Sequence, residues 1–180
     1  MAEGYERATI RRIAEEVGVS STALYMHFRD KAEILLEISE ATIRILLERN
    51  RDIAARPLDS VQRIRMMLEA YASWGFDHPN AYQLVYGQAR DVPKAPVHQT
   101  ADLAARCYEI FSGVVRETAR EGRLKRGDAD SAAQALWACV HGVVHLWTTH
   151  TEFGWVAREE LLRVALDGVL DGVTSPAPRS

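Results

Sequence analysis

The chain has 180 residues, of which 47% are hydrophobic and 26% charged, and its formal net charge at pH 7 is −3. This length holds one sizeable core, or a small N-terminal domain joined to a larger body. No stretch is apolar over the length of a membrane span, and Met1 is not followed by the apolar segment of a signal peptide, so we expect a cytoplasmic protein with no membrane partner. The two cysteines, Cys107 and Cys139, have no metal-binding spacing, and we expect both to be reduced thiols.

The N-terminal segment predicts two short helices joined by a tight turn. Thr9 is a favourable N-cap for a helix that ends at Val17, Gly18 permits the turn, and Ser20 or Ser21 can cap the second helix. Helical spacing turns two residues of the second helix inward, Leu24 and Phe28. It turns the others outward: Thr22, Ala23, Tyr25, Met26 and His27. Two short helices with such an outer face are typical of a helix-turn-helix that reads DNA.

The charge of this segment does not by itself indicate nucleic acid binding. Residues 1–31 contain five basic and five acidic side chains, which cancel. A basic footprint is the usual electrostatic mark of a DNA-binding domain. We give the motif more weight than the charge, because a dimer that reads bases through a small surface needs only a few phosphate contacts.

The segment from Thr9 to Ser20, followed by Leu24-Tyr25-Met26-His27-Phe28 and Asp30-Lys31, resembles the DNA-binding half of TetR-type regulators. The resemblance implies a DNA-binding domain over residues 1–32. It implies base contacts from Ser21, Thr22, Ala23 and Met26, and phosphate contacts from Thr9, Tyr25, His27 and Lys31. The family begins with a further helix, of which Ala2–Tyr5 resembles the last turn, so we expect most of that helix to be missing from this chain.

The rest of the chain predicts helices throughout and no strands, so we expect an all-α fold with a helical body over residues 33–173. The predicted helices span about 31–55, 60–75, 79–87, 97–121, 129–149 and 158–172, and we expect a disordered tail over 174–180. Asp30, Asp59 and either Asp128 or Asp130 are the predicted N-caps. The predicted inward residues of the first helix are Ile34, Leu35, Ile38, Ile45, Leu46 and Ile53.

Aromatic residues on these helices are candidates for the lining of a ligand cavity, although at helical spacing each could equally be ordinary core. The predicted ligand-binding residues are Tyr71, Trp74, Tyr82, Phe111, Trp137 and His141. His141 could orient a polar group of the ligand or be a satisfied buried histidine. His141 and His145 have the spacing of metal ligands on a helix, but no third ligand is evident. We therefore predict no metal and no cofactor.

The helix predicted over 129–149 has a bulky stripe that includes Trp137 and His141, and an opposite stripe of mostly small residues. We expect the small stripe and the last helix to form a homodimer interface. Its predicted residues are Cys139, Gly142, Leu146, Leu162, Leu166 and Val169. The pattern Trp137…His141-Gly142, with Trp74 and His78-Pro79 upstream, also resembles the Trp-His-Gly type of TetR C-terminal domain.

These observations predict a homodimeric TetR-type repressor that a small, largely apolar effector releases from a palindromic DNA operator. An enzyme is disfavoured because the chain lacks Gly-x-Ser-x-Gly, a P-loop, Gly-x-Gly-x-x-Gly and His-Glu-x-x-His. The alternative is a helical ligand-binding or interaction protein that does not bind DNA.

Overall fold

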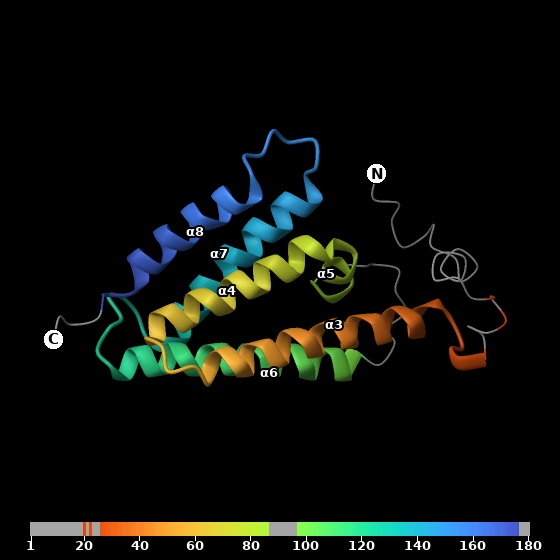
Figure 1. The fold of residues 1–180 in the computed structure, drawn as a ribbon, viewed down its shortest axis with the longest axis horizontal. Coiled ribbons are helices and arrows are strands. Elements are labelled where there is room, and N and C mark those ends of the chain that lie inside the picture. Colours follow the sequence, from red (N-terminus) through yellow and green to blue (C-terminus); the bar gives the residue numbers. More distant parts are fainter. Residues whose placement is uncertain (1–19, 21, 23–25, 87–96, 177–180) are drawn as a thin grey trace.

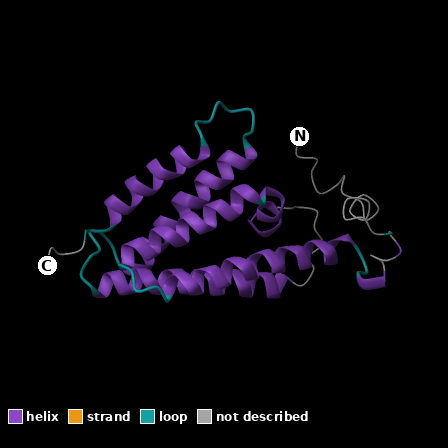
Figure 2. Ribbon diagram, viewed as in Figure 1, coloured by secondary structure: helices purple, strands orange, loops and turns teal. Residues whose placement is uncertain are grey.

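The computed structural model describes residues 20, 22, 26–86 and 97–176. Its described part contains six helices: α3 (Lys31–Ala54), α4 (Ser60–Asp77), α5 (Pro79–Tyr86), α6 (Val97–Arg120), α7 (Ala129–Thr149) and α8 (Arg158–Val173). Within those residues the only β-type pairing is an isolated bridge between Leu124 and Thr174. The predicted all-α fold is therefore confirmed (Figure 2). The helix predicted over residues 9–17 lies outside the described residues.

Local chemistry sets the ends of these helices. The side chain of Asp30 accepts a hydrogen bond from the N–H of Glu33, Asp59 accepts from Val61 and Gln62, and Asp128 accepts from Ser131. Each carboxylate satisfies backbone donors that the first helical turn leaves free. Gly122 and Gly127 both have a φ of +69°, and they bracket the turn between α6 and α7.

Helix α4 is the centre of the body, since it contacts each of the other five described helices. Figure 1 shows α3 and α6 side by side along one edge, with α7 and α8 on the other side of α4. Gly75 lets α4 approach α7 closely, because a Cβ atom at this position would lie 2.5 Å from Val144 Cγ1. Helix α3 begins at the end of the molecule where residues 26–30 lie and runs along the body.

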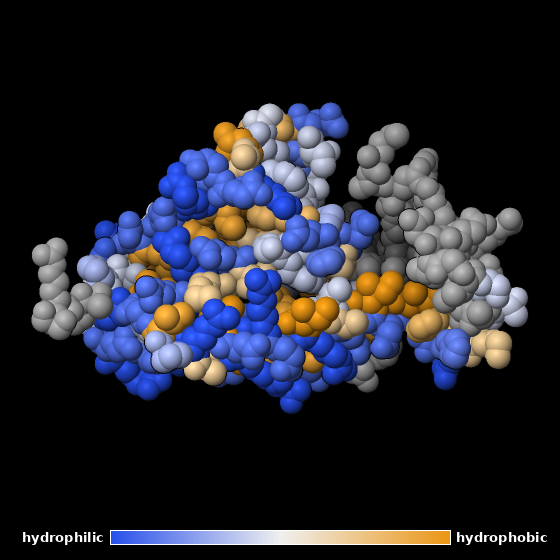
Figure 3. Space-filling view, in the orientation of Figure 1, coloured by the Kyte–Doolittle hydropathy of each residue, from blue (hydrophilic) through white to orange (hydrophobic). Residues whose placement is uncertain are grey.

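The predicted inward face of α3 is only partly correct. Ile34, Leu46 and Ile53 are buried, but Ile38 is 43% exposed and Ile45 is 67% exposed. The buried stripe instead follows Ile43, Leu46, Leu47, Asn50 and Ile53, and Ile38 and Ile45 lie off it. In Figure 3 the visible face is mostly polar, with apolar surface along the α3 side. The side chain of Leu35 lies outside the described residues.

The predicted disorder of residues 174–176 is wrong. Thr174 is buried, and its N–H donates to the carbonyl of Leu170. The N–H of Ser175 donates to the carbonyl of Arg123, whose guanidinium donates back to the Ser175 carbonyl at 3.0 Å. Because Arg123 also pairs with Asp59, this segment is fixed to the start of α4. Residues 177–180 lie outside the described part of the chain.

Candidate ligand-binding site

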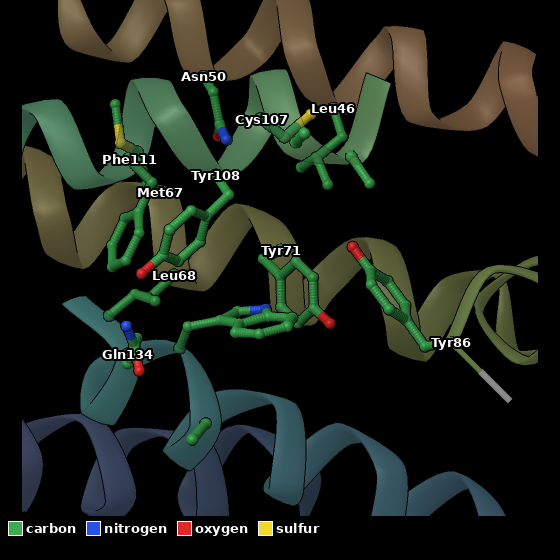
Figure 4. Close-up of a pocket in the computed structure, with 14 residues that line it drawn as sticks. Leu46, Asn50, Met67, Leu68, Tyr71, Tyr86, Cys107, Tyr108, Phe111 and Gln134 are labelled. Atoms are coloured by element: carbon green, nitrogen blue, oxygen red, sulfur yellow. The ribbon is translucent and has the colours of Figure 1, made fainter. Parts of the chain in front are cut away.

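A cavity of about 560 Å³ lies between α3, α4, α6 and α7, with α5 at one end (Figure 4). Small-molecule sites in proteins are typically about 300–1,000 Å³. The lining residues come from five helices: Leu46, Asn50, Met67, Leu68, Tyr71, Tyr86, Ala104, Ala105, Cys107, Tyr108, Phe111, Gln134, Trp137 and Ala138. The cavity is therefore large enough for a small organic molecule.

The lining is mostly apolar and aromatic, with Tyr71, Tyr86, Tyr108, Phe111 and Trp137 supplying the rings. None of the described lining residues is charged. In such apolar surroundings, burying an ionised group without a partner costs on the order of several kcal/mol. The cavity therefore suits a molecule whose buried part is uncharged and largely apolar.

The structure separates the six predicted ligand-binding residues into two sets. Tyr71, Phe111 and Trp137 line the cavity. Trp74, Tyr82 and His141 do not line it. They pack behind the wall, with their rings 6.3 Å, 6.2 Å and 6.4 Å from the Tyr71 ring. The prediction that these three residues contact the ligand is therefore not supported by the geometry, because Tyr71 lies in front of them.

Behind the cavity wall, two tyrosine hydroxyls converge on one histidine. The hydroxyl oxygens of Tyr71 and Tyr82 each lie 2.8 Å from Nδ1 of His141. The Tyr82 hydroxyl also lies 3.2 Å from the carbonyl oxygen of His141 and can donate its proton there. In that arrangement Nδ1 of His141 pairs with the hydroxyl of Tyr71. The ring of Tyr71 itself lines the cavity.

The members of this cluster are uncharged at neutral pH. Burial, and then the neighbouring His145, lowers the pKa of His141 below 6.5. Burial raises the pKa of Tyr82 to about 12, and it also raises the pKa of Tyr71. The hydroxyls therefore act as neutral hydrogen-bond donors and acceptors.

The remaining predictions concern a metal site at His141 and His145 and the state of the two thiols. The rings of His141 and His145 stack with their centroids 6.1 Å apart. Among the described residues, no group of three or more His, Cys, Asp or Glu side chains is arranged to hold a metal ion. Cys107 and Cys139 are both free thiols, and burial raises the pKa of Cys107 to about 11.

Asn50 and Tyr108 are lining residues that the sequence reasoning missed. The sequence does contain a signal for Asn50, because this polar residue occupies a position on the buried apolar stripe of α3. Tyr108 gives no such signal, since an aromatic residue on a helix is equally consistent with ordinary core.

Of the predicted DNA-contacting residues, Thr22, Met26 and His27 are exposed to solvent. Thr9, Ser21, Ala23 and Tyr25 lie outside the described residues. Lys31 is the first residue of α3, although its side chain is not among those described. In the described part of the chain, no helix is both long enough and apolar enough to cross a membrane.

The predicted dimer residues lie on two different faces. On α7, Cys139 and Gly142 are half-buried and Leu146 is 46% exposed, and the thiol of Cys139 lies 3.9 Å from the carbonyl oxygen of Ala165 on α8. Leu166, in contrast, is 1% exposed and belongs to the core of its own subunit, so its assignment to the interface is wrong. Leu162 and Val169 are half-buried and pack against the same core. The outer face of α8 instead carries Leu161, Val164, Ala165, Gly168 and Gly172.

Comparison with known proteins agrees with this architecture. Over 140 residues the chain is 29% identical to nucleoid occlusion factor SlmA of Vibrio vulnificus (strain YJ016), covering 76% of this chain and 68% of that protein. The TetR family regulator PfmR from Thermus thermophilus has a similar structure, with a TM-score of 0.77 and 23% identity over 94% of this chain and 91% of that one. FadR from Bacillus subtilis, solved in complex with stearoyl-CoA, gives a TM-score of 0.75 and 18% identity over 94% and 90% of the two chains.

Two family descriptions match the sequence itself. Residues 1–38 match "bacterial regulatory proteins, tetR family", and residues 64–169 match "tetracyclin repressor-like, C-terminal domain". Neither description names the Trp-His-Gly type, so the resemblance to that type stays a prediction. The second match alone spans more than half of the chain. The chain therefore belongs to the TetR family of DNA-binding transcription regulators, whose members are typically not enzymes.

Proposed function

We propose that this regulator is a homodimeric repressor, and that it leaves a palindromic operator when a small, largely apolar molecule occupies the cavity. The observation that carries the proposal is the cavity of about 560 Å³, none of whose described lining residues is charged and part of whose wall is formed by α3. Helix α3 is the element that begins beside the described residues of the DNA-binding domain.

The geometry of α3 supports coupling between the cavity and the DNA-binding domain. Leu46 and Asn50 of α3 line the cavity, and Lys31 begins the helix. At 1.5 Å per residue, Asn50 lies about 28 Å along the helix axis from Lys31. A ligand that prefers one position of α3 therefore also prefers one position of the two DNA-binding domains. Its effect is limited to its differential affinity for the two states, typically about 1–3 kcal/mol per site.

The outer face of α7 and α8 supports the homodimer. Leu146 on α7 and Val164 on α8 are 46% and 55% exposed, and small residues lie beside both of them. A Cβ atom added at Gly142 or Gly168 would meet no atom within 4 Å beyond the adjacent residues and the backbone of its own helix. Helices from a second subunit can therefore approach this face closely and bury its apolar side chains.

The apolar character of the cavity supports an effector with an apolar body. The structure of the similar regulator FadR contains stearoyl-CoA, a molecule with a long apolar chain. In the present chain, aromatic rings from α4, α5, α6 and α7 surround the cavity. These rings suit a planar or chain-like apolar group that would bury most of its surface.

Selection of bound genomic fragments, followed by transcription in vitro, tests the proposal. We expect the selected sites to be palindromes with half-sites one helical turn apart, about 34–36 Å, and binding to weaken steeply as salt is raised. Transcription from a promoter that carries such a site should fall when the protein is added. An increase in transcription would identify an activator, and selected sites without two-fold symmetry would contradict the dimeric arrangement.

A further inference from the structure

Asn50 is the polar member of the buried stripe of α3. Its neighbours on the stripe, Leu46, Leu47 and Ile53, are buried and apolar, and Asn50 itself is only 5% exposed. Asparagine is rarely buried to this extent unless its amide group is hydrogen-bonded. We therefore expect the side-chain amide of Asn50 to have a hydrogen-bond partner.

No described residue supplies that partner. The side-chain oxygen of Asn50 is buried and accepts no hydrogen bond from the described part of the chain. Leaving such an acceptor unpaired typically costs about 1–3 kcal/mol, whereas an apolar side chain of similar size would avoid the cost. Stability of the fold alone does not explain an asparagine here.

The amide group faces the ligand cavity. Figure 4 shows Asn50 extending from α3 toward the cavity, on the side formed by α3 and α6. The nearby thiol of Cys107 is directed to the carbonyl oxygen of Ile43, 3.9 Å away. Gln134, the other amide of the lining, is exposed and comes from α7. Asn50 is thus the buried amide that a ligand would meet at the α3 wall.

We propose that Asn50 determines effector specificity, its side-chain oxygen accepting a hydrogen bond from a hydroxyl or N–H group of an uncharged, otherwise apolar ligand. This inference rests on the proposed function, because it assumes that the cavity is the effector site. The class of ligand follows from the lining. The side-chain oxygen of Asn50 requires a hydrogen-bond donor. None of the described lining residues is charged, which disfavours an ionised group at this end of the ligand. Analogues that lack the donor leave the amide oxygen unpaired, and the site discriminates against them for that reason.

A set of three matched compounds tests the inference, with the neutral fluorescent dye Nile red as the reporter of an occupied cavity. The compounds are para-phenylphenol, which has a hydroxyl donor, its methyl ether, which has only an acceptor, and biphenyl, which has neither. Displacement of Nile red from the wild-type protein gives the affinity of each. We expect para-phenylphenol to bind about tenfold more tightly than the other two, the effect of one buried hydrogen bond.

Two variants assign that preference to Asn50. In Asn50→Leu the preference should disappear, and the melting temperature should be equal to or higher than that of the wild type. Gln134→Leu removes an amide from the same cavity but from its exposed side, and it should keep the preference. Asn50→Ala provides a second variant that removes the amide without adding bulk.

The outcomes separate this inference from the proposed function. If Nile red does not bind the wild-type protein, the cavity takes no apolar ligand, and both proposals fail. If Nile red binds but the three compounds displace it equally, or if the preference survives in Asn50→Leu, only the role of Asn50 is overturned. Unfolding of both Asn50→Leu and Asn50→Ala would give Asn50 a structural role and would also overturn it.

Discussion

The hydroxyl oxygen of Tyr71 lies 2.8 Å from Nδ1 of His141, which joins the centre of α4 to the centre of α7. The ring of Tyr71 lines the ligand cavity, whereas His141 lies behind it. The hydrogen bond therefore fixes the orientation of a cavity wall from outside the cavity. This arrangement gives His141 a positioning role and makes the wall sensitive to the protonation state of the imidazole.

The first prediction concerns pH. Burial lowers the pKa of His141 below its ordinary value of 6.5, so the unfolded chain binds a proton more readily than the folded protein. Stability should therefore be complete above about pH 6.5 and should fall as the pH decreases toward the folded-state pKa. Thermal unfolding at about pH 7.5 and about pH 5.5 measures this loss. We expect a smaller loss in His141→Asn, which keeps a polar group but cannot titrate.

Replacement of the exposed His150 by Gln provides the control for that experiment. It removes an imidazole from the end of α7, away from the Tyr71–His141 cluster, and the pH dependence of this variant should follow that of the wild type. Equal losses in the wild type and His141→Asn would show that His141 does not contribute.

The second prediction separates the two tryptophans near the cavity. Trp137 lines the cavity and is half-buried, so Trp137→Ala should weaken Nile red binding at least tenfold while the protein stays folded. Trp74 is buried in the core behind Tyr71, so Trp74→Ala should lower the free energy of unfolding by about 3–5 kcal/mol. Denaturant unfolding and dye titration of both variants give the comparison. A Trp74→Ala protein of wild-type stability would contradict the structural assignment.

The third prediction concerns the ion pair that fixes residues 174–176. Burial acts to raise the pKa of Asp59, but hydrogen bonds from Arg123 and from the backbone N–H groups of Gln62 and Val61 outweigh it, and the net pKa is lowered. Arg123 is buried while Asp59 is partly exposed, so we expect Arg123→Met to cost about 2–4 kcal/mol, less than a fully buried pair can. Denaturant unfolding measures the loss.

Arg163 is the matched control for Arg123. It pairs with Glu160 and Asp167 on the exposed side of α8, where solvent screens ion pairs and they contribute little to stability. Arg163→Met should therefore be nearly neutral. If Arg123→Met and Arg163→Met lowered the free energy of unfolding by similar amounts, burial would not distinguish the two ion pairs.

The fourth prediction concerns the subunit interface. Val164 is 55% exposed on the outer face of α8, so Val164→Glu should give folded monomers. Ile45→Glu introduces the same charge at an exposed site on α3 and should leave the dimer intact. Light scattering after size-exclusion chromatography measures the mass. A dimeric Val164→Glu protein would place the interface on another face. Leu166→Glu, in contrast, is expected to unfold the chain, because the Leu166 side chain is buried in the core of its own subunit.

The helices could be predicted from the sequence because their ends are set by local chemistry. Asp30, Asp59 and Asp128 each cap a helix through backbone donors within three residues, and such contacts can be read from the chain itself. The boundaries predicted for the six helices from α3 to α8 are accordingly confirmed to within two residues. The order of residues 174–176 could not be predicted, because it depends on Arg123, which is 52 positions away from Ser175.

The faces of the helices were harder to assign than their ends. Helix α8 has apolar residues on two stripes, and the sequence does not indicate which one faces the core. Leu166 was therefore placed at the interface, although it is buried, while Val164 was overlooked. Which aromatic residues line the cavity likewise depends on the relative rotation of α4 and α7, which places Tyr71 in front of Trp74.

Coupling between the cavity and the DNA-binding domains is the central claim, and operator affinity at saturating ligand tests it most directly. Compounds that displace Nile red would be added to the protein bound to a fluorescent operator, and the dissociation constant measured by anisotropy. We predict that such compounds weaken operator binding about 5- to 150-fold, and that Trp137→Ala binds the operator normally but no longer responds. If compounds that saturate the cavity leave the operator dissociation constant unchanged, the cavity does not control DNA binding, and the account is wrong.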